Sequence, residues 1–104
     1  MTGAVIDRSP DARRDAARLA LWIGRESGVD RAQAVMDRLE ATLNRLARRP
    51  RLGRVRLDLI GEPRSFPVGP WSIIYEPLED DRGILVLRIV DNRRDIAALM
   101  GKKS

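Results

Sequence analysis

The chain has 104 residues, enough for one modest hydrophobic core, so we expect a single domain over residues 1–104. It contains neither cysteine nor histidine, which excludes a disulfide framework, a Cys/His zinc site and any catalytic dyad built on a thiolate or an imidazole. The net charge is +5 at pH 7 and 18 of the 20 basic residues are arginine, so we expect an anionic partner, either nucleic acid or an acidic protein.

The first expected elements are a short strand at residues 4–8 and a helix from about residue 10 to residue 26. Ser9 is a favourable N-cap, and Pro10 occupies the first helical position, where its missing N–H costs nothing. Apolar residues follow the i, i+4, i+7, i+8, i+11 spacing of one buried helical face: Ala12, Ala16, Leu19, Ala20 and Ile23. Gly28 supplies the left-handed conformation that commonly ends a helix.

A second helix is expected to begin two or three residues after the first helix ends and to stop before Pro50. Asp30 followed by Gln33 resembles a capping box at its start. Its apolar stripe consists of Ala32, Val35, Met36, Leu39, Leu43 and Leu46. Two amphipathic helices joined by so short a loop must run antiparallel, as an αα-hairpin.

The rest of the chain predicts a sheet and a short last helix. A connecting region rich in Pro and Gly contains one short strand near 64–68, and its prolines indicate that this strand lies at a sheet edge or ends quickly. A hairpin of two long strands follows at about 71–77 and 84–91, joined by an acidic turn. Helical spacing resumes at residues 95–100 and gives a helix of barely two turns.

Strict alternation predicts which residues share a face of this sheet. One face of the first long strand carries Trp71, Ile73 and Tyr75. On the partner strand, one face carries Leu85, Leu87 and Ile89, and the other carries Ile84, Val86, Arg88 and Val90. Because both faces are largely apolar, one should be covered by the helical hairpin and the other by the C-terminal helix or another protein chain.

The expected fold is therefore α+β. An antiparallel sheet, made of the short N-terminal strand plus a three-stranded meander, packs against an N-terminal αα-hairpin, and a short C-terminal helix follows.

Three stretches carry a resemblance to a known superfamily: "RPRLGRVRLDL", "PRSFPVGPWSIIYE" and "ILVLRIVDNRRDIAAL". In order and spacing they resemble the RelE/ParE toxin superfamily of bacterial type II toxin–antitoxin systems, over essentially the whole chain. The matching features are a Pro-x-x-Gly step, an Arg opening a strand, an aromatic residue and a Tyr on the next strand, and an Arg-Asp pair before the last helix. The residues at these positions are Pro50, Gly53, Arg64, Trp71, Tyr75, Arg94 and Asp95.

The superfamily implies two different activities. Its RelE-like branch cleaves mRNA on the ribosome, which requires groups that accept and donate protons near the scissile phosphate. Here Ser72 stands where that branch usually has an Arg, and residues 95–100 contain neither Tyr nor His. The ParE-like branch poisons DNA gyrase and needs only a binding surface, so the resemblance favours that branch. Asp91 departs from the pattern, because many members have a His at that position.

The resemblance therefore implies a non-enzymatic toxin, without metal or cofactor, that inhibits DNA gyrase with possible indirect DNA contact. A cognate antitoxin would neutralise it in a hetero-oligomer. The alternatives are a RelE-like ribosome-dependent mRNA endoribonuclease and a non-toxic nucleic-acid-binding module. No segment reads as a secretory signal, and no apolar run approaches the roughly 20 residues that span a bilayer. We thus expect a cytoplasmic protein without membrane contact.

The candidate contact residues form three groups. Candidates for target binding are Arg93, Arg94, Arg64 and Arg88. The alternative for the first two is a helix start with Asp91 or Asn92 as N-cap, and for the last two ion pairs with Glu76 or Asp95. Candidates for facing the antitoxin are Trp71, Tyr75, Leu99 and Met100, and the alternatives for both aromatic residues are the core and a stacking platform for bases.

The third group is the densest basic run, Arg45, Arg48, Arg49, Arg51, Arg54 and Arg56. Three interpretations remain open for it. It could dock on nucleic acid or gyrase-bound DNA, in which case binding would fall steeply with salt. It could bind an acidic antitoxin tail, or it could be a solvated helix end that complements the helix dipole.

Overall fold

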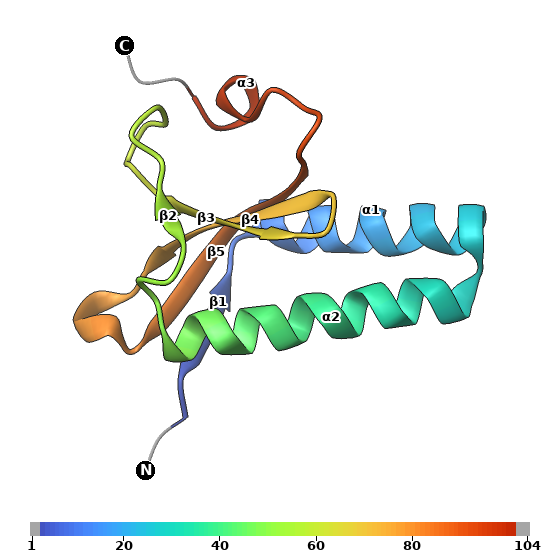
Figure 1. Cartoon of the computed structure of the whole chain (residues 1–104), viewed down its shortest axis with the longest axis horizontal. Coiled ribbons are helices and arrows are strands. Elements are labelled where there is room, and N and C mark those ends of the chain that lie inside the picture. The colour runs from blue at the N-terminus through green and yellow to red at the C-terminus, as the bar shows by residue number, and fades with distance from the viewer. Residues whose placement is uncertain (1–2, 102–104) are drawn as a thin grey trace.

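The computed structural model describes residues 3–101, which form a five-stranded sheet, a helical hairpin and a short C-terminal helix (Figure 1). The elements are β1 (Val5–Arg8), α1 (Pro10–Ser27), α2 (Val29–Arg48), β2 (Arg54–Val55), β3 (Arg64–Val68), β4 (Trp71–Pro77), a 3₁₀ helix η1 (Glu79–Asp81), β5 (Gly83–Asp91) and α3 (Ile96–Met100). The α+β class, the helical hairpin, the β3–β4–β5 meander and the short last helix are as the sequence predicted.

The helical hairpin turns at one residue. Ser9 caps α1 as predicted, because its side chain accepts a hydrogen bond from the backbone N of Ala12 at 3.0 Å. Gly28, with φ of 91°, both ends α1 and precedes α2. The predicted capping box is wrong, because this glycine lets α2 begin at once and Gln33 instead donates to Asp37 at 2.8 Å. Within residues 3–101, neither long helix is apolar enough to cross a membrane.

The sheet order is β1-β5-β4-β3-β2. β1 runs parallel to β5, with Val5 opposite Gly83, and the other neighbours are antiparallel. The wholly antiparallel arrangement expected from the sequence is therefore wrong for the N-terminal strand. The reason is the connection: the helical hairpin carries the chain away from the sheet, and such long crossovers permit parallel pairing. The two-residue strand β2 adds an edge that was not predicted.

A β-bulge interrupts the pairing of β4 with β5. Ile74 pairs with Arg88 and Tyr75 pairs with Val86, which leaves Leu87 as an extra residue in β5. A bulge reverses the in-and-out alternation beyond it. The residues of β5 that pack with the helices are Ile84, Val86 and Ile89. The predicted shared face of Leu85, Leu87 and Ile89 is therefore wrong.

The core lies between the helical hairpin and one face of the sheet. The helices contribute Ala12, Ile23, Val35, Leu39, Leu43, Leu46 and Ala47, and the sheet contributes Val68, Ile73, Tyr75, Ile84 and Val86. On the other face, Ile74 and Val90 are also buried.

The second face of the sheet is covered by the chain itself. α3 lies on the opposite side of the sheet from α2 (Figure 1). The connection from β2 to β3 joins it there, because the backbone N of Ile60 donates to the carbonyl of Gly101 at 3.1 Å, and that connection buries Leu59 completely. The C-terminal helix, one of the two covers considered from the sequence, therefore shares this role with a loop.

Candidate functional site

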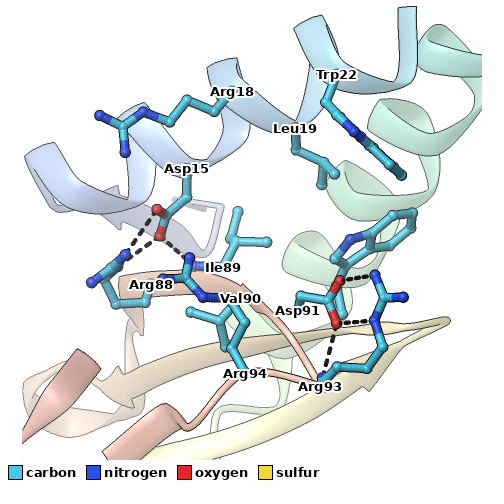
Figure 2. A pocket seen from close by; sticks show the side chains of 11 residues that line it. Asp15, Arg18, Leu19, Trp22, Arg88, Ile89, Val90, Asp91, Arg93 and Arg94 are labelled. Atoms are coloured by element: carbon cyan, nitrogen blue, oxygen red, sulfur yellow. Dashed lines mark hydrogen bonds and ion pairs between the residues drawn. The ribbon is translucent and has the colours of Figure 1, made fainter. Parts of the chain in front are cut away.

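A groove of about 370 Å³ lies between α1, the start of β4 and the end of β5 (Figure 2). We call it the Trp–Arg groove after its principal residues, which are Trp22, Trp71, Arg18, Arg88, Arg93, Arg94, Asp15 and Asp91. These include both tryptophans of the chain, whose other aromatic residues are one tyrosine and one phenylalanine. The groove thus brings both tryptophans together with four arginines.

The α1 wall of the groove was not predicted from the sequence. Asp15, Leu19 and Trp22 follow the i, i+4, i+7 spacing that places residues on one side of a helix. Trp22 lies off the apolar stripe that packs on the sheet, and 54% of its surface is exposed. The one feature of the sequence that could have indicated this wall is a large aromatic residue, Trp22, next to the buried apolar stripe.

Asp15 and Arg88 join α1 to β5. Arg88 Nε donates to Asp15 Oδ2 at 2.8 Å and its Nη2 donates to Oδ1 at 3.1 Å, while the backbone N of Ile89 donates to Oδ2 at 2.9 Å. The hydrogen bond to Asp15 raises the pKa of Arg88. Because this bidentate pair is mostly buried, Arg88 holds the groove together. The ion pairs predicted for it, with Glu76 or Asp95, are wrong.

Asp91 and Arg93 form the turn that follows β5. Arg93 Nη2 donates to Asp91 Oδ2 at 2.7 Å, and the backbone N of Arg93 donates to Oδ1 at 2.8 Å. The side-chain and backbone hydrogen bonds from Arg93 lower the pKa of Asp91 to about 2. At neutral pH the Asp91 carboxylate is therefore ionised and hydrogen-bonded to Arg93.

Helix α3 begins after this turn. Asp95 is its N-cap and accepts a hydrogen bond from the backbone N of Ala98 at 3.2 Å. The prediction that Asp91 or Asn92 caps this helix is wrong, because Asp91 closes its own turn and Asn92 accepts a hydrogen bond from Ser72. Arg93 and Arg94 consequently lie in the turn, outside the helix.

Two arginines of the groove remain available. Four arginines against two aspartates leave an excess of two positive charges, and both aspartates are already paired. Arg18 and Arg94 are exposed and have no ion-pair partner among residues 3–101. Figure 2 shows them on opposite walls, Arg18 on α1 and Arg94 after β5. The groove therefore combines an aromatic surface with two unneutralised guanidinium groups.

Arg64 and Tyr75 lie away from the groove and hold the loop that follows α2. Tyr75 is completely buried, and its hydroxyl donates to the carbonyl of Pro50 and accepts from the backbone N of Gly53, both at 2.8 Å. Burial raises the pKa of Tyr75. Arg64 donates to the carbonyl of Gly53 at 2.7 Å and to that of Arg51 at 3.1 Å. Tyr75 therefore belongs to the core, one of the interpretations left open by the sequence, and the alternative that it faces an antitoxin is wrong.

The predicted basic run is divided in the fold. Within the described residues, Arg56 pairs with Asp58, Arg51 pairs with Asp81, and the Arg45 guanidinium lies 5.7 Å from the centre of the Phe66 ring. The hydrogen bond from Arg56 lowers the pKa of Asp58 to about 2. Arg48, Arg49 and Arg54 are exposed, and none forms an ion pair with any residue of 3–101. Arg45 is also exposed and its contact with Phe66 does not neutralise its charge, so four of the six arginines have no carboxylate partner among residues 3–101.

Leu99 and Met100 are half-buried on α3. They line another hollow, of about 230 Å³, together with Ser9, Leu87 and Arg88. Because Arg88 also lines the Trp–Arg groove, it separates the two hollows.

Comparisons with known proteins identify a family by sequence and a similar fold by structure. Residues 6–96 match the family model described as the ParE toxin of type II toxin-antitoxin system, parDE. The chain is similar to Toxin ParE3 of Caulobacter vibrioides, with 42% identity over 78 residues, which are 75% of this chain and 76% of that protein. Its fold is similar to a solved chain of the chromosomal ParDE TA system from P. aeruginosa, with a TM-score of 0.71 and 16% identity, covering 85% of this chain and 95% of that one.

Proposed function

Because this chain belongs to the ParE toxin family of type II toxin–antitoxin systems, we propose that it inhibits DNA gyrase and is neutralised by a cognate antitoxin. The family membership confirms the resemblance that the sequence motifs carried. Gyrase as the target, the cytoplasm as the place of action and a hetero-oligomer with the antitoxin are parts of this proposal.

The chemistry of the Trp–Arg groove supports inhibition by binding. Its carboxylates, Asp15 and Asp91, both accept hydrogen bonds from arginines, and the pKa of Asp91 is about 2. Its other polar side chains are arginines and the indoles of tryptophan, which do not exchange protons near neutral pH. A general base or acid needs a pKa near the working pH, so this set of groups is suited to contact rather than proton transfer.

We assign the target contact to the turn after β5 and the facing wall of α1. Arg93 and Arg94 are exposed in that turn, and 83% of the Arg93 side chain is accessible. Arg18 and Trp22 extend the same surface across the groove. Arg88 is the positioning residue behind it, whereas Arg64 supports the fold.

We assign the antitoxin contact to the exposed apolar side chains. Leu21, Trp22 and Val29 are exposed near the turn of the helical hairpin. Trp71 lines the groove beside them, and Leu99 and Met100 line the hollow next to it. An antitoxin segment with apolar and acidic residues would cover these surfaces and neutralise the excess positive charge.

The test is induction of the chain in bacteria with and without its antitoxin, followed by supercoiling and cleavage assays with purified gyrase. We expect growth arrest without antitoxin and accumulation of gyrase-cleaved DNA. Reversing two groove charges, in Arg93→Glu with Arg94→Glu, should abolish both effects. The matched control reverses two exposed arginines at the hairpin turn, in Arg25→Glu with Arg31→Glu, and should leave gyrase inhibition intact.

Two outcomes would replace this proposal. Cutting of ribosome-bound mRNA with gyrase untouched would establish the RelE-like activity. Salt-dependent nucleic-acid binding without growth arrest would establish a non-toxic binding module.

A further inference from the structure

We propose that the Trp–Arg groove binds a nucleotide, with the base on its tryptophans and the phosphate between Arg18 and Arg94. This inference concerns a direct ligand of the chain itself. It therefore does not depend on whether gyrase is the target.

The aromatic part of the argument rests on Trp22 and Trp71. Both tryptophans of the chain line this one groove, with Leu19 and Ile89 beside them. Stacking of a base on an aromatic side chain contributes about 1–3 kcal/mol and tolerates any base, because every base has a π face. Trp22 is more than half exposed, so its indole is accessible to a ligand from solution.

The electrostatic part of the argument depends on which arginines of the groove already pair with a carboxylate. Arg88 donates two side-chain hydrogen bonds to Asp15, and Arg93 donates two to Asp91, so both guanidinium groups already have a carboxylate partner. Arg18 and Arg94 have no ion pair with any residue in the described range 3–101, and they approach the groove from opposite walls (Figure 2). Guanidinium groups match the geometry of phosphate oxygens, and two of them compensate the charge of one phosphate.

The size of the groove also fits. Its volume of about 370 Å³ falls within the range of about 300–1,000 Å³ that is common for sites of small ligands. An acidic peptide would supply its negative charge and its apolar surface from separate residues. A nucleotide carries a planar ring and an anion in one compact unit, which is the combination that the groove presents.

Intrinsic tryptophan fluorescence reports directly on this site, because all of it originates from the groove. The purified chain is titrated with ATP, with deoxyadenosine monophosphate and with a short oligothymidylate, without gyrase and at low salt. We expect saturable quenching. Quenching by the mononucleotides would identify a free nucleotide as the source, and quenching by the oligonucleotide alone would identify a single DNA strand.

Variants distinguish the groove from general charge attraction. Arg18→Gln and Arg94→Gln should each raise the dissociation constant about tenfold, because each removes a charge-assisted hydrogen bond to phosphate. For the oligonucleotide, each variant should also make the plot of the logarithm of the association constant against the logarithm of salt concentration less steep, by about 0.7 in slope. Arg31→Gln, an exposed arginine outside the groove, should change neither.

Two results would overturn the proposal. One is the absence of saturable quenching by all three nucleotide probes at low salt, whether or not an acidic peptide containing aromatic residues quenches. The other is quenching that survives in both Arg18→Gln and Arg94→Gln with affinity unchanged. Because Arg18 and Arg94 are exposed, both variants should fold, and circular dichroism would verify this.

Discussion

Arg88 and Arg93 both pair with an aspartate, but water reaches the two pairs to different extents. The Arg88 and Asp15 side chains are 18% and 10% exposed, whereas those of Arg93 and Asp91 are 83% and 24% exposed. Breaking a buried pair leaves an uncompensated charge in a poorly solvated place, while an exposed pair contributes little to stability. Arg88 is therefore a residue of the fold, and Arg93 is free to exchange its partner for a ligand.

We expect Asp15→Ala to lower the free energy of unfolding by about 3 kcal/mol, because it leaves Arg88 and the backbone N of Ile89 without their acceptor. Urea unfolding followed by circular dichroism measures the change. Arg14→Ala breaks the exposed pair with Asp11 on the same helix and should cost under about 0.5 kcal/mol. Equal losses in the two variants would show that the Asp15–Arg88 pair has no special role.

The Asp91 carboxyl should titrate with a midpoint near pH 2 in the folded chain, because Arg93 donates to its ionised form. A folded-state pKa below the unfolded value of about 3.9 stabilises the fold above that value, and this contribution is lost as the pH falls through 2. Carboxyl NMR shifts measure the midpoint.

Arg93→Ala should return the Asp91 midpoint toward about 3.9. Asp58 is the internal control, because Arg56 rather than Arg93 holds its pKa at about 2. A midpoint near 4 for Asp91 in the unaltered chain would contradict the geometry of the turn.

The sequence indicated half of the groove. Arg93 and Arg94 were singled out because arginines at an expected helix start oppose the helix dipole. Trp71 was singled out by the family resemblance, and Arg88 as a basic residue on a strand. Asp15 and Trp22 were not, because their positions depend on how α1 packs against β5, and Asp15 meets Arg88 across 73 positions of sequence. Contacts of that range leave no local pattern in the sequence.

Among the elements, the loop between α2 and β2 is fixed by a close approach to β4. A Cβ atom on Gly53 would lie 2.5 Å from Tyr75 Oη and 2.9 Å from the carbonyl oxygen of Ser65. The loop therefore needs a residue without a side chain at this position, which gives the Pro-x-x-Gly step of the sequence a steric cause.

We expect Gly53→Ala to destabilise the chain by about 1–3 kcal/mol, because the methyl group would displace the buried Tyr75 hydroxyl from its partners. Gly24→Ala is the matched control in α1, where an added Cβ meets nothing within 4 Å. It should stabilise the helix by about 0.5–1 kcal/mol. The thermal unfolding midpoint should fall in Gly53→Ala and rise in Gly24→Ala. A change in the same direction in both variants would contradict the steric argument.

The elements themselves were more predictable than their pairing. Caps, apolar periodicity and turn residues marked α1, the three-stranded meander and α3 almost to their ends, because these signals act over a few residues. The bulge at Leu87 and the parallel pairing of β1 were not predicted, since the first depends on the register of β4 against β5 and the second on where β1 lies relative to β5 in the folded sheet.

At the scale of the whole molecule, exposed apolar surface remains beside the charged groove. Leu21 and Val29 are 61% and 79% exposed near the turn of the helical hairpin. Such residues are usually covered by a partner when they occur together, and without one they favour self-association.

The chain alone should therefore self-associate as its concentration rises, and the combination of Leu21→Gln with Val29→Gln should keep it monomeric to higher concentration. Sedimentation velocity measures the distribution of species. Ala17→Gln, at another exposed position of α1, should leave the behaviour unchanged. A chain that is monomeric at every concentration would argue against an apolar docking surface at the hairpin turn.

The parallel pairing of β1 with β5 also determines when the toxin is complete during its synthesis. β1 is translated before the helical hairpin, whereas its partner strand β5 is translated after β4, and Arg93 and Arg94 follow directly after it. The helical hairpin can form early from local contacts, but sheet closure must wait for β5. We therefore expect the nascent protein to be harmless, with its apolar helical faces open to an antitoxin before the groove exists.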